Sequence, residues 1–178
     1  MIVAVRHPRP AIPAGICYGQ LDVALADPPA PAAKALIDRL APQRFDRIVA
    51  SPMRRAWQLA EAVAEGLGLS LDAEPRLQEL NFGAWEGIAW DAIPREEIDA
   101  WAADPLDYRP RGGETVAELA SRVEQAWREA TARARHELWI THAGPMRCLY
   151  ALTQGLPLAR CLDRRFAYGE VLELTPPS

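Results

Sequence analysis

Short apolar stretches that end abruptly in polar residues constrain the fold of this chain most. In "IVAVRHP" the β-branched residues of the stretch 2–5 favour a short buried strand. Pro8 cannot donate to a sheet ladder, and the residue before a proline avoids the helical region. We therefore expect the strand to end at Arg6 and His7, where the backbone turns.

The same pattern recurs further along the chain. "FDRIVASP" predicts a strand over 48–50 that ends at Ser51, and "ELWIT" predicts a strand that ends at His142. Two shorter strands are predicted within "LSLDAEPRL" and "GEVLEL". Helical patterns separate these strands and cover 31–40, 53–68, 95–102, 115–135 and 144–155. Alternating strands and helices predict an α/β three-layer sandwich, with a mostly parallel central sheet and helices on both faces.

Two of the predicted helices carry start signals. Ser51 is a suitable N-cap, with Pro52 at the first helical position. Thr115 and Glu118, three residues apart, form a capping box. These signals predict helices that begin directly after Ser51 and Thr115.

The length of 178 residues predicts a single domain over residues 1–178. From Asn81 to Gly113 the periodic pattern breaks, and three tryptophans lie among glycines and prolines. We expect this 81–113 segment to form a lid or rim over the site. The net charge of −4 argues against a nucleic-acid partner.

The cysteine pattern and the hydropathy bear on the cellular setting. Three cysteines without a CxxC spacing indicate neither a disulfide framework nor a zinc site. No apolar stretch reaches the ~18 residues of a membrane span. We expect a cytoplasmic protein with no membrane partner and no metal.

The polar ends of the predicted strands suggest a shared site. Carboxyl ends of parallel strands meet at one edge of a sheet, which places Arg6, His7 and His142 together. The helix after Ser51 adds its N-terminus and Arg54 to the same edge. Guanidinium groups and helix N-termini bind phosphate oxygens. The sequence therefore predicts a phosphate site.

Five segments resemble the histidine phosphatase superfamily, which also contains the cofactor-dependent phosphoglycerate mutases. "VRHP" resembles its Arg-His-Gly signature, and "SPMRRAWQLAEAV" its Ser-Pro-x-x-Arg-Ala segment. "LQELNFGAWEG", "GGET" and "THAGPMR" resemble its three later segments. All five stand in the family's order and span residues 6 to 147.

The resemblance implies a role for each matched residue. His7 is the implied nucleophile, which becomes phosphorylated, and Arg6, Arg54 and His142 bind the phosphoryl group. Glu79 is the implied proton donor and acceptor. Two arginines and a protonated His142 would take the place of a metal, and no cofactor is implied. Surrounding positive charge would lower the pKa of His7 and keep it nucleophilic.

Two positions depart from the family pattern. Pro8 stands where the family commonly has glycine, and Ala143 stands where the last motif has its first glycine. Neither change removes a side chain with an implied catalytic role. We therefore expect activity with a modified pocket geometry.

A shorter segment bears on the substrate. "GICYGQLDVALA" resembles the α-ribazole 5′-phosphate phosphatases of cobalamin assembly, a branch of the same family. This resemblance implies a benzimidazole riboside monophosphate as the substrate. Tyr18 and Gln20 are then the candidate contacts to the leaving group.

Other functions remain open at this stage. A broad-specificity small-molecule phosphatase and a phosphoglycerate mutase fit the same residues, although the short chain favours hydrolysis. A protein-phosphohistidine phosphatase is a further alternative, but short members of that branch tend to lack the glutamate segment. A non-catalytic phosphate-binding module would lack the nucleophile or the proton donor, and both His7 and Glu79 are present. The sequence does not determine the oligomeric state.

Overall fold

A five-stranded sheet forms the centre of the protein, with strand order β3-β2-β4-β1-β5. The computed structural model describes residues 1–175. Strands β1 (Ile2–Arg6), β2 (Arg47–Ala50), β3 (Leu71–Ala73) and β4 (Glu137–Thr141) are parallel to one another. Strand β5 (Val171–Leu174) pairs with β1 in the antiparallel direction. The predicted mostly parallel sheet is confirmed.

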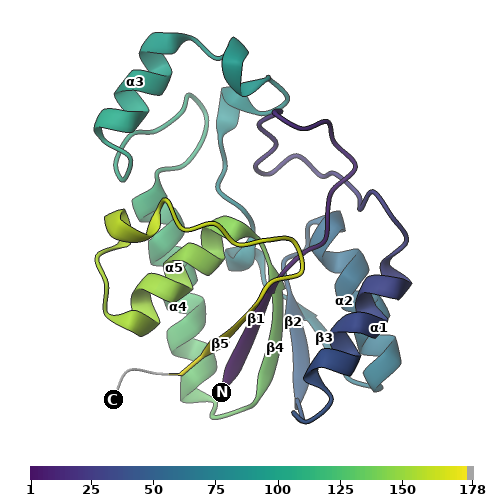
Figure 1. Ribbon diagram of the computed structural model, residues 1–178. Coiled ribbons are helices and arrows are strands. Elements are labelled where there is room, and N and C mark those ends of the chain that lie inside the picture. The colour runs from purple at the N-terminus through teal and green to yellow at the C-terminus, as the bar shows by residue number, and fades with distance from the viewer. Residues whose placement is uncertain (176–178) are drawn as a thin grey trace.

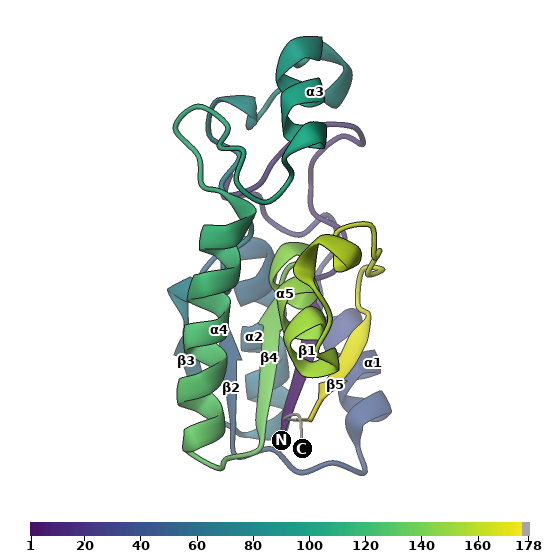
Figure 2. The ribbon, with the colours of Figure 1, turned by 90° about the vertical axis from the view of Figure 1, so that its left-hand side faces the viewer.

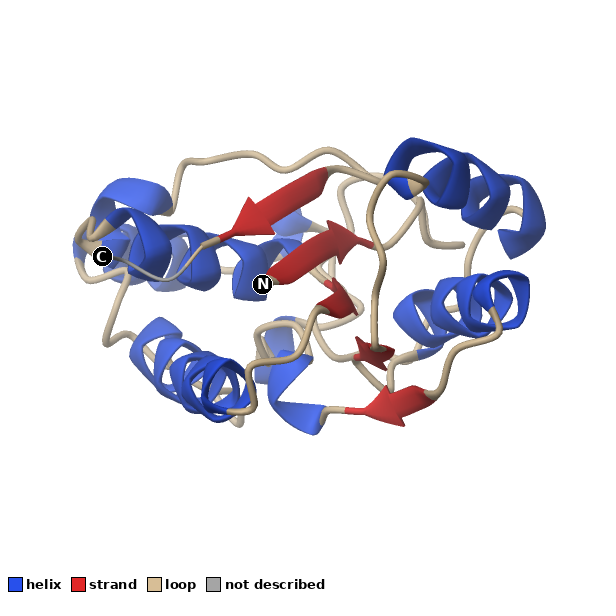
Figure 3. Cartoon of the chain, turned by 90° about the horizontal axis from the view of Figure 1, so that it is seen from below, coloured by secondary structure: helices blue, strands red, loops and turns tan. Residues whose placement is uncertain are grey.

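Helices cover both faces of the sheet (Figures 1 and 3). Helices α1 (Pro29–Leu40) and α2 (Arg54–Leu67) lie on one face. Helices α4 (Val116–Ala132) and α5 (Ala143–Gln154) lie on the other. Helix α3 (Arg95–Ala103) stands apart from both layers, beyond the end of the sheet (Figure 2). The predicted α/β three-layer sandwich is confirmed.

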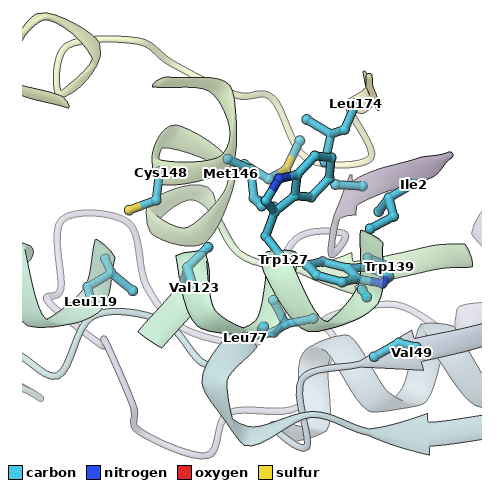
Figure 4. Packing of buried hydrophobic residues seen from close by; sticks show 14 of the residues in the cluster. Ile2, Val49, Leu77, Leu119, Val123, Trp127, Trp139, Met146, Cys148 and Leu174 are labelled. Atoms are coloured by element: carbon cyan, nitrogen blue, oxygen red, sulfur yellow. The ribbon is translucent and has the colours of Figure 1, made fainter. Parts of the chain in front are cut away.

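Successive residues of each strand point to opposite faces, and this alternation divides the core in two. Val3 and Val5 of β1 pack with α1 and α2, whereas Ile2 and Ala4 pack with α4 and α5. Figure 4 shows the cluster on the α4 and α5 face of the sheet, to which Trp139 of β4 belongs. A strand buried on both faces needs a continuous apolar run, and residues 2–5 provide one.

Of the two predicted helix starts, the one at Thr115 is correct and the one at Ser51 is not. The capping box of Thr115 and Glu118 is confirmed. The predicted N-cap at Ser51 is wrong, because α2 has Met53 as its N-cap residue. The Ser51 hydroxyl lies 2.8 Å from Nε2 of His142 and 3.4 Å from the Met53 amide nitrogen, so its closer partner is the imidazole.

The 81–113 segment lies beyond the carboxyl ends of the parallel strands, together with the loop that follows β1 (Figures 1 and 2). It contains two 3₁₀ turns, Gly83–Trp85 and Trp90–Ala92, and helix α3. Its side chains form a small apolar cluster with Cys17 of the β1–α1 loop. The segment is therefore packed internally and held by the loop opposite it.

Candidate active site

Three polar strand ends meet at one edge of the sheet. Strand β4 lies between β1 and β2. The residues that follow β1 and β2, His7 and Ser51, are hydrogen-bonded to β4. The amide of His7 donates to the carbonyl of Thr141 (3.0 Å), and the amide of Ser51 donates to that of Ile140 (3.0 Å). The structure thus brings His7 and His142 together, as the sequence pattern predicts, and also places Ser51 beside His142.

The imidazole of His7 is held in one orientation by the residue that follows it. Nδ1 lies 2.6 Å from the Pro8 carbonyl oxygen. Because a carbonyl can only accept, Nδ1 carries the proton and Nε2 keeps its lone pair. Pro8, which lacks an amide hydrogen, therefore still orients the imidazole through its carbonyl.

The pKa of His7 is lowered to about 3. Burial of the ring is the largest cause, followed by the positive charge of Arg55, with a smaller contribution from Arg6. His7 is neutral at pH 7 as a result. The predicted direction of the pKa shift is confirmed, although burial contributes more than the neighbouring charges.

His142 lies edge-on to His7, with ring centroids 4.9 Å apart. It is fully buried, and its pKa lies well below 6.5 because of burial and then the proximity of His7 and Arg55. The expectation of a protonated His142 is therefore wrong for the free protein. Nε2 faces Ser51, and Nδ1 is buried without a hydrogen-bond partner within residues 1–175.

The structure places Arg55, rather than Arg54, beside the two imidazoles. Arg55 is completely buried and donates to the carbonyls of Leu21 (2.8 Å) and Gly19 (2.5 Å). Arg54 is exposed, and its backbone amide donates to the Asp22 carboxylate (2.8 Å). Successive residues of a helix point about 100° apart, so only one of the two can face the site.

A signal for Arg55 was present in the sequence. In the segment that resembles Ser-Pro-x-x-Arg-Ala, the matching arginine stands four positions after Ser51 and directly before Ala56. That position is Arg55. The assignment of Arg54 thus placed the motif one residue too early.

Arg6 approaches the site from the end of β1. Its guanidinium donates to the Phe166 carbonyl (2.5 Å) and lies 4.0 Å from the centroid of the Tyr168 ring. The Tyr168 ring centroid is 5.8 Å from that of His7, and its hydroxyl is 3.4 Å from that of Tyr18. Burial and the Tyr168 hydroxyl raise the pKa of Tyr18 to about 12. Tyr168 was not anticipated, because no motif or periodicity marks its loop.

The carboxylate of Glu79 is held at the N-terminus of α5. It accepts from the Gly144 amide at 3.0 and 3.2 Å and from the Leu80 amide at 2.9 Å. A Cβ atom at position 144 would collide with Oε1 of Glu79. The glycine in "THAGPMR" therefore allows the acid to approach the helix.

The backbone around Glu79 is held by side chains from elsewhere in the chain. Arg122 of α4 donates to the carbonyls of Gln78 (2.8 Å) and Glu79 (3.0 Å), and to the carboxylate of Glu114. The side-chain amide of Gln20 also donates to the Glu79 carbonyl (3.0 Å). The structure thus uses Gln20 to support Glu79 and does not place it in the cavity wall, in contrast to the expected substrate contact.

A cavity of about 780 Å³ is lined by Arg6 and Glu79 of the site and by side chains of the 81–113 segment. Arg6, Tyr18, Glu79 and Gly144 line its reaction end. Most of the remaining lining is apolar, and it includes Trp90, Trp101, Val116, Leu119, Leu158 and Leu162. The arrangement combines a cluster of cations and imidazoles with a large apolar space beside it.

Comparison with protein families agrees with this geometry. The family model of the histidine phosphatase superfamily (branch 1) matches residues 2–177. The chain belongs to the histidine phosphatase superfamily. The resemblance identified from the five segments is confirmed.

Several proteins are similar to this histidine phosphatase over most of its length. Phosphoserine phosphatase 1 of Hydrogenobacter thermophilus is 28% identical over 165 residues, which cover 89% of this chain and 78% of the relative. The structure of a mycobacterial glucosyl-3-phosphoglycerate phosphatase aligns with a TM-score of 0.83 at 26% identity, covering 96% of this chain and 87% of the other. The structure of the α-ribazole phosphatase from Shigella flexneri aligns with a TM-score of 0.85 at 24% identity and the same coverage of each chain.

These comparisons establish the class of the protein. The histidine phosphatase is an enzyme, and its relatives are named for reactions on small phosphate esters. At 24% sequence identity, the similarity to the Shigella protein shows that the two chains share a fold. The names of the relatives cover different substrates, so the substrate of this chain is a separate question.

Features outside the site bear on the remaining expectations. Cys17, Cys148 and Cys161 are free and buried. In the part of the chain that the structure describes, no helix is long and apolar enough to cross a membrane. Over the same residues, no group of three or more histidine, cysteine and acidic side chains is arranged to hold a metal ion. A metal-free mechanism and a cytoplasmic location stay predictions.

Proposed function

We propose that this histidine phosphatase hydrolyses phosphomonoesters without a metal, through a phosphohistidine on Nε2 of His7. The observation that carries the proposal is the state of this imidazole. It is buried and neutral, its Nδ1 hydrogen is bound to the Pro8 carbonyl, and its Nε2 has no hydrogen-bond partner among residues 1–175. Arg6, Arg55 and His142 surround it with groups that bind a phosphoryl oxygen.

In the first step Nε2 of His7 attacks phosphorus, so that a P–N bond forms while the P–O bond to the leaving group breaks. Glu79, in its protonated form, gives its proton to the departing oxygen. The guanidinium groups of Arg6 and Arg55 stabilise the charge on the phosphoryl oxygens. A neutral His142 can add a hydrogen bond from Nδ1 while Nε2 accepts one from the Ser51 hydroxyl.

In the second step water attacks the phosphohistidine. Glu79, now a carboxylate, takes a proton from this water as its oxygen bonds to phosphorus. The P–N bond breaks, inorganic phosphate leaves, and both His7 and Glu79 return to their starting states. The amide of Gly144 holds the Glu79 carboxylate in place between the two steps.

The test is turnover of an aryl phosphate in the presence of a chelator, combined with acid-free trapping of the phosphoenzyme. Wild type is expected to turn over and to carry phosphate on histidine. His7→Ala is expected to lose both, and Glu79→Gln to turn over about 100- to 10,000-fold more slowly. Equal hydrolysis by wild type and His7→Ala would contradict the phosphohistidine. A folded wild type without turnover would indicate a phosphate-binding module.

For the substrate we propose α-ribazole 5′-phosphate. The support is the resemblance of "GICYGQLDVALA" to that branch of the family and the position of Tyr18 in the cavity wall. A kcat/KM about 100-fold above phosphoserine, glucosyl-3-phosphoglycerate and 3-phosphoglycerate would support this substrate. Similar rates across the panel would favour a broad-specificity phosphatase. Transfer of phosphate to a second hydroxyl, instead of its release, would indicate a mutase.

A further inference from the structure

Two tryptophans of the 81–113 segment form an aromatic wall of the cavity. The rings of Trp90 and Trp101 stack with centroids 6.0 Å apart and an angle of 13° between their planes. Both side chains are half-buried, and both residues line the cavity. Part of each indole therefore remains available to a bound molecule.

Other aromatic rings hold this wall in place. Trp85 lies edge-on to both indoles, with its centroid 5.7 Å from Trp101 and 6.4 Å from Trp90. The Trp85 indole nitrogen donates to the Glu97 carboxylate of α3 (2.5 Å). Phe82 contacts the wall at right angles, 5.3 Å from Trp90. A wall fixed by its own supporting layer loses little conformational freedom when a ligand binds.

The rest of the cavity is also apolar. Val116 and Leu119 of α4 line it, as do Leu158 and Leu162 after α5. Four of its lining residues carry charge, and two of these, Arg6 and Glu79, belong to the reaction end. The space that the leaving group enters is thus bounded mainly by hydrocarbon and indole.

The size and polarity of this space favour particular substrates. A leaving group as small as serine or glycerate fills a minor part of about 780 Å³ and leaves the indoles in contact with water. A flat aromatic ring instead displaces that water and stacks on the indole faces. Pockets of this size and lining are typical of sites for ring-bearing small molecules.

We propose that the Trp90–Trp101 wall is the leaving-group site, and that it selects phosphomonoesters whose alcohol part carries a flat aromatic ring. This inference rests on the proposed phosphatase function. It does not require α-ribazole 5′-phosphate, which is one member of the class. Trp101 is then a specificity-determining residue, because it contacts the leaving group, whereas residues at the strand ends bind the phosphoryl group.

The experiment compares two alkyl phosphates with the same reacting centre, 2-(2-naphthyl)ethyl phosphate and ethyl phosphate. Wild type is expected to show a kcat/KM about 100-fold higher for the naphthyl ester. Trp101→Ala is expected to reduce this ratio by about 10-fold or more. Trp101→Phe, which keeps an aromatic face, restores part of the ratio.

Two further variants keep the result interpretable. Trp57→Ala removes a tryptophan from α2 that does not line the cavity, and the substrate ratio should not change. Leu158→Gln places a polar group in the apolar lining outside the 81–113 segment and should lower the ratio of the naphthyl ester to ethyl phosphate. Ethyl phosphate turnover reports in each variant that the catalytic residues are correctly folded.

The two proposals fail in different ways. Equal kcat/KM for the two esters in wild type, or an unchanged ratio in Trp101→Ala, would overturn the leaving-group site and leave the phosphatase function intact. Calorimetric titration of His7→Ala with each ester measures the preference without turnover. Selective naphthyl ester binding without turnover in wild type would support the site and contradict the phosphatase function.

Discussion

Arg54 and Arg55 are neighbours in the chain, yet their side chains have different surroundings. Arg55 is buried, with its guanidinium 5.0 Å from the centroid of the Tyr18 ring and bound to two carbonyls of the β1–α1 loop. Its charge lowers the pKa of both His7 and His142. Arg54 is exposed, and its side chain makes none of these contacts within residues 1–175.

Substitution of the two arginines should have unequal effects. We expect Arg55→Ala to lower kcat/KM by about 100- to 1,000-fold, because it removes a preorganised donor from the phosphoryl site. Arg54→Ala should stay within about 3-fold of wild type, as is usual for an exposed side chain. Steady-state kinetics on an aryl phosphate measure both. A larger loss in Arg54→Ala than in Arg55→Ala would contradict the assignment.

At the scale of elements, α4 positions the segment that follows β3. Arg122 lies in the second turn of this helix and donates to the carbonyls of Gln78 and Glu79, while Glu114 accepts from its guanidinium. The same Glu114 carboxylate accepts from the Asn81 amide (3.0 Å). Arg122 and Glu114, which we call the clamp, therefore hold the segment that carries Glu79 next to α5.

Removal of the clamp should affect the chemical step. We expect Arg122→Ala to lower kcat by about 10- to 100-fold, because a displaced Glu79 no longer meets the leaving oxygen. The KM should change by less than about 3-fold, since the phosphoryl-binding groups remain. Arg128→Ala is the matched control, because Arg128 is exposed on the same helix and pairs with Glu124. A rise in KM with unchanged kcat would indicate a binding role instead.

At the scale of the whole molecule, two buried neutral histidines link folding to pH. The pKa of His7 is about 3 and that of His142 lies well below 6.5, whereas both are near 6.5 in an unfolded chain. At a pH below 6.5 but above the folded-state pKa values, the two histidines bind protons in the unfolded chain and remain neutral in the folded protein. The stabilising contribution is thus complete above pH 6.5 and is lost as the pH falls toward 3.

Urea unfolding between pH 7.5 and 5 should reveal this linkage. For each histidine, the free energy of unfolding should fall by up to about 1.4 kcal/mol per pH unit below 6.5. Carboxylates paired with arginine, such as Glu74, have lowered pKa values and contribute at more acidic pH. His7→Gln should show a shallower pH dependence over this range. An unchanged slope in that variant would contradict a neutral buried His7.

Much of the site followed from local chemistry. The apolar runs before Arg6 and His142 were short and punctuated by proline or polar residues, so the strands and their ends could be recognised. Glu79 was recognised from its motif, and the structure holds it at the start of α5. By contrast, the role of Ser51 was misjudged, because its hydroxyl has two partners within reach and only the fold brings His142 near it.

The alternation of strands and helices, and therefore the edge where the polar strand ends meet, can be predicted from local sequence, because strand and helix periodicity are properties of neighbouring residues. Two contacts follow only from the tertiary structure: Tyr168 lies against His7, and Gln20 supports Glu79. These contacts join residues far apart in the chain. Their geometry depends on the paths of loops, which no local pattern encodes.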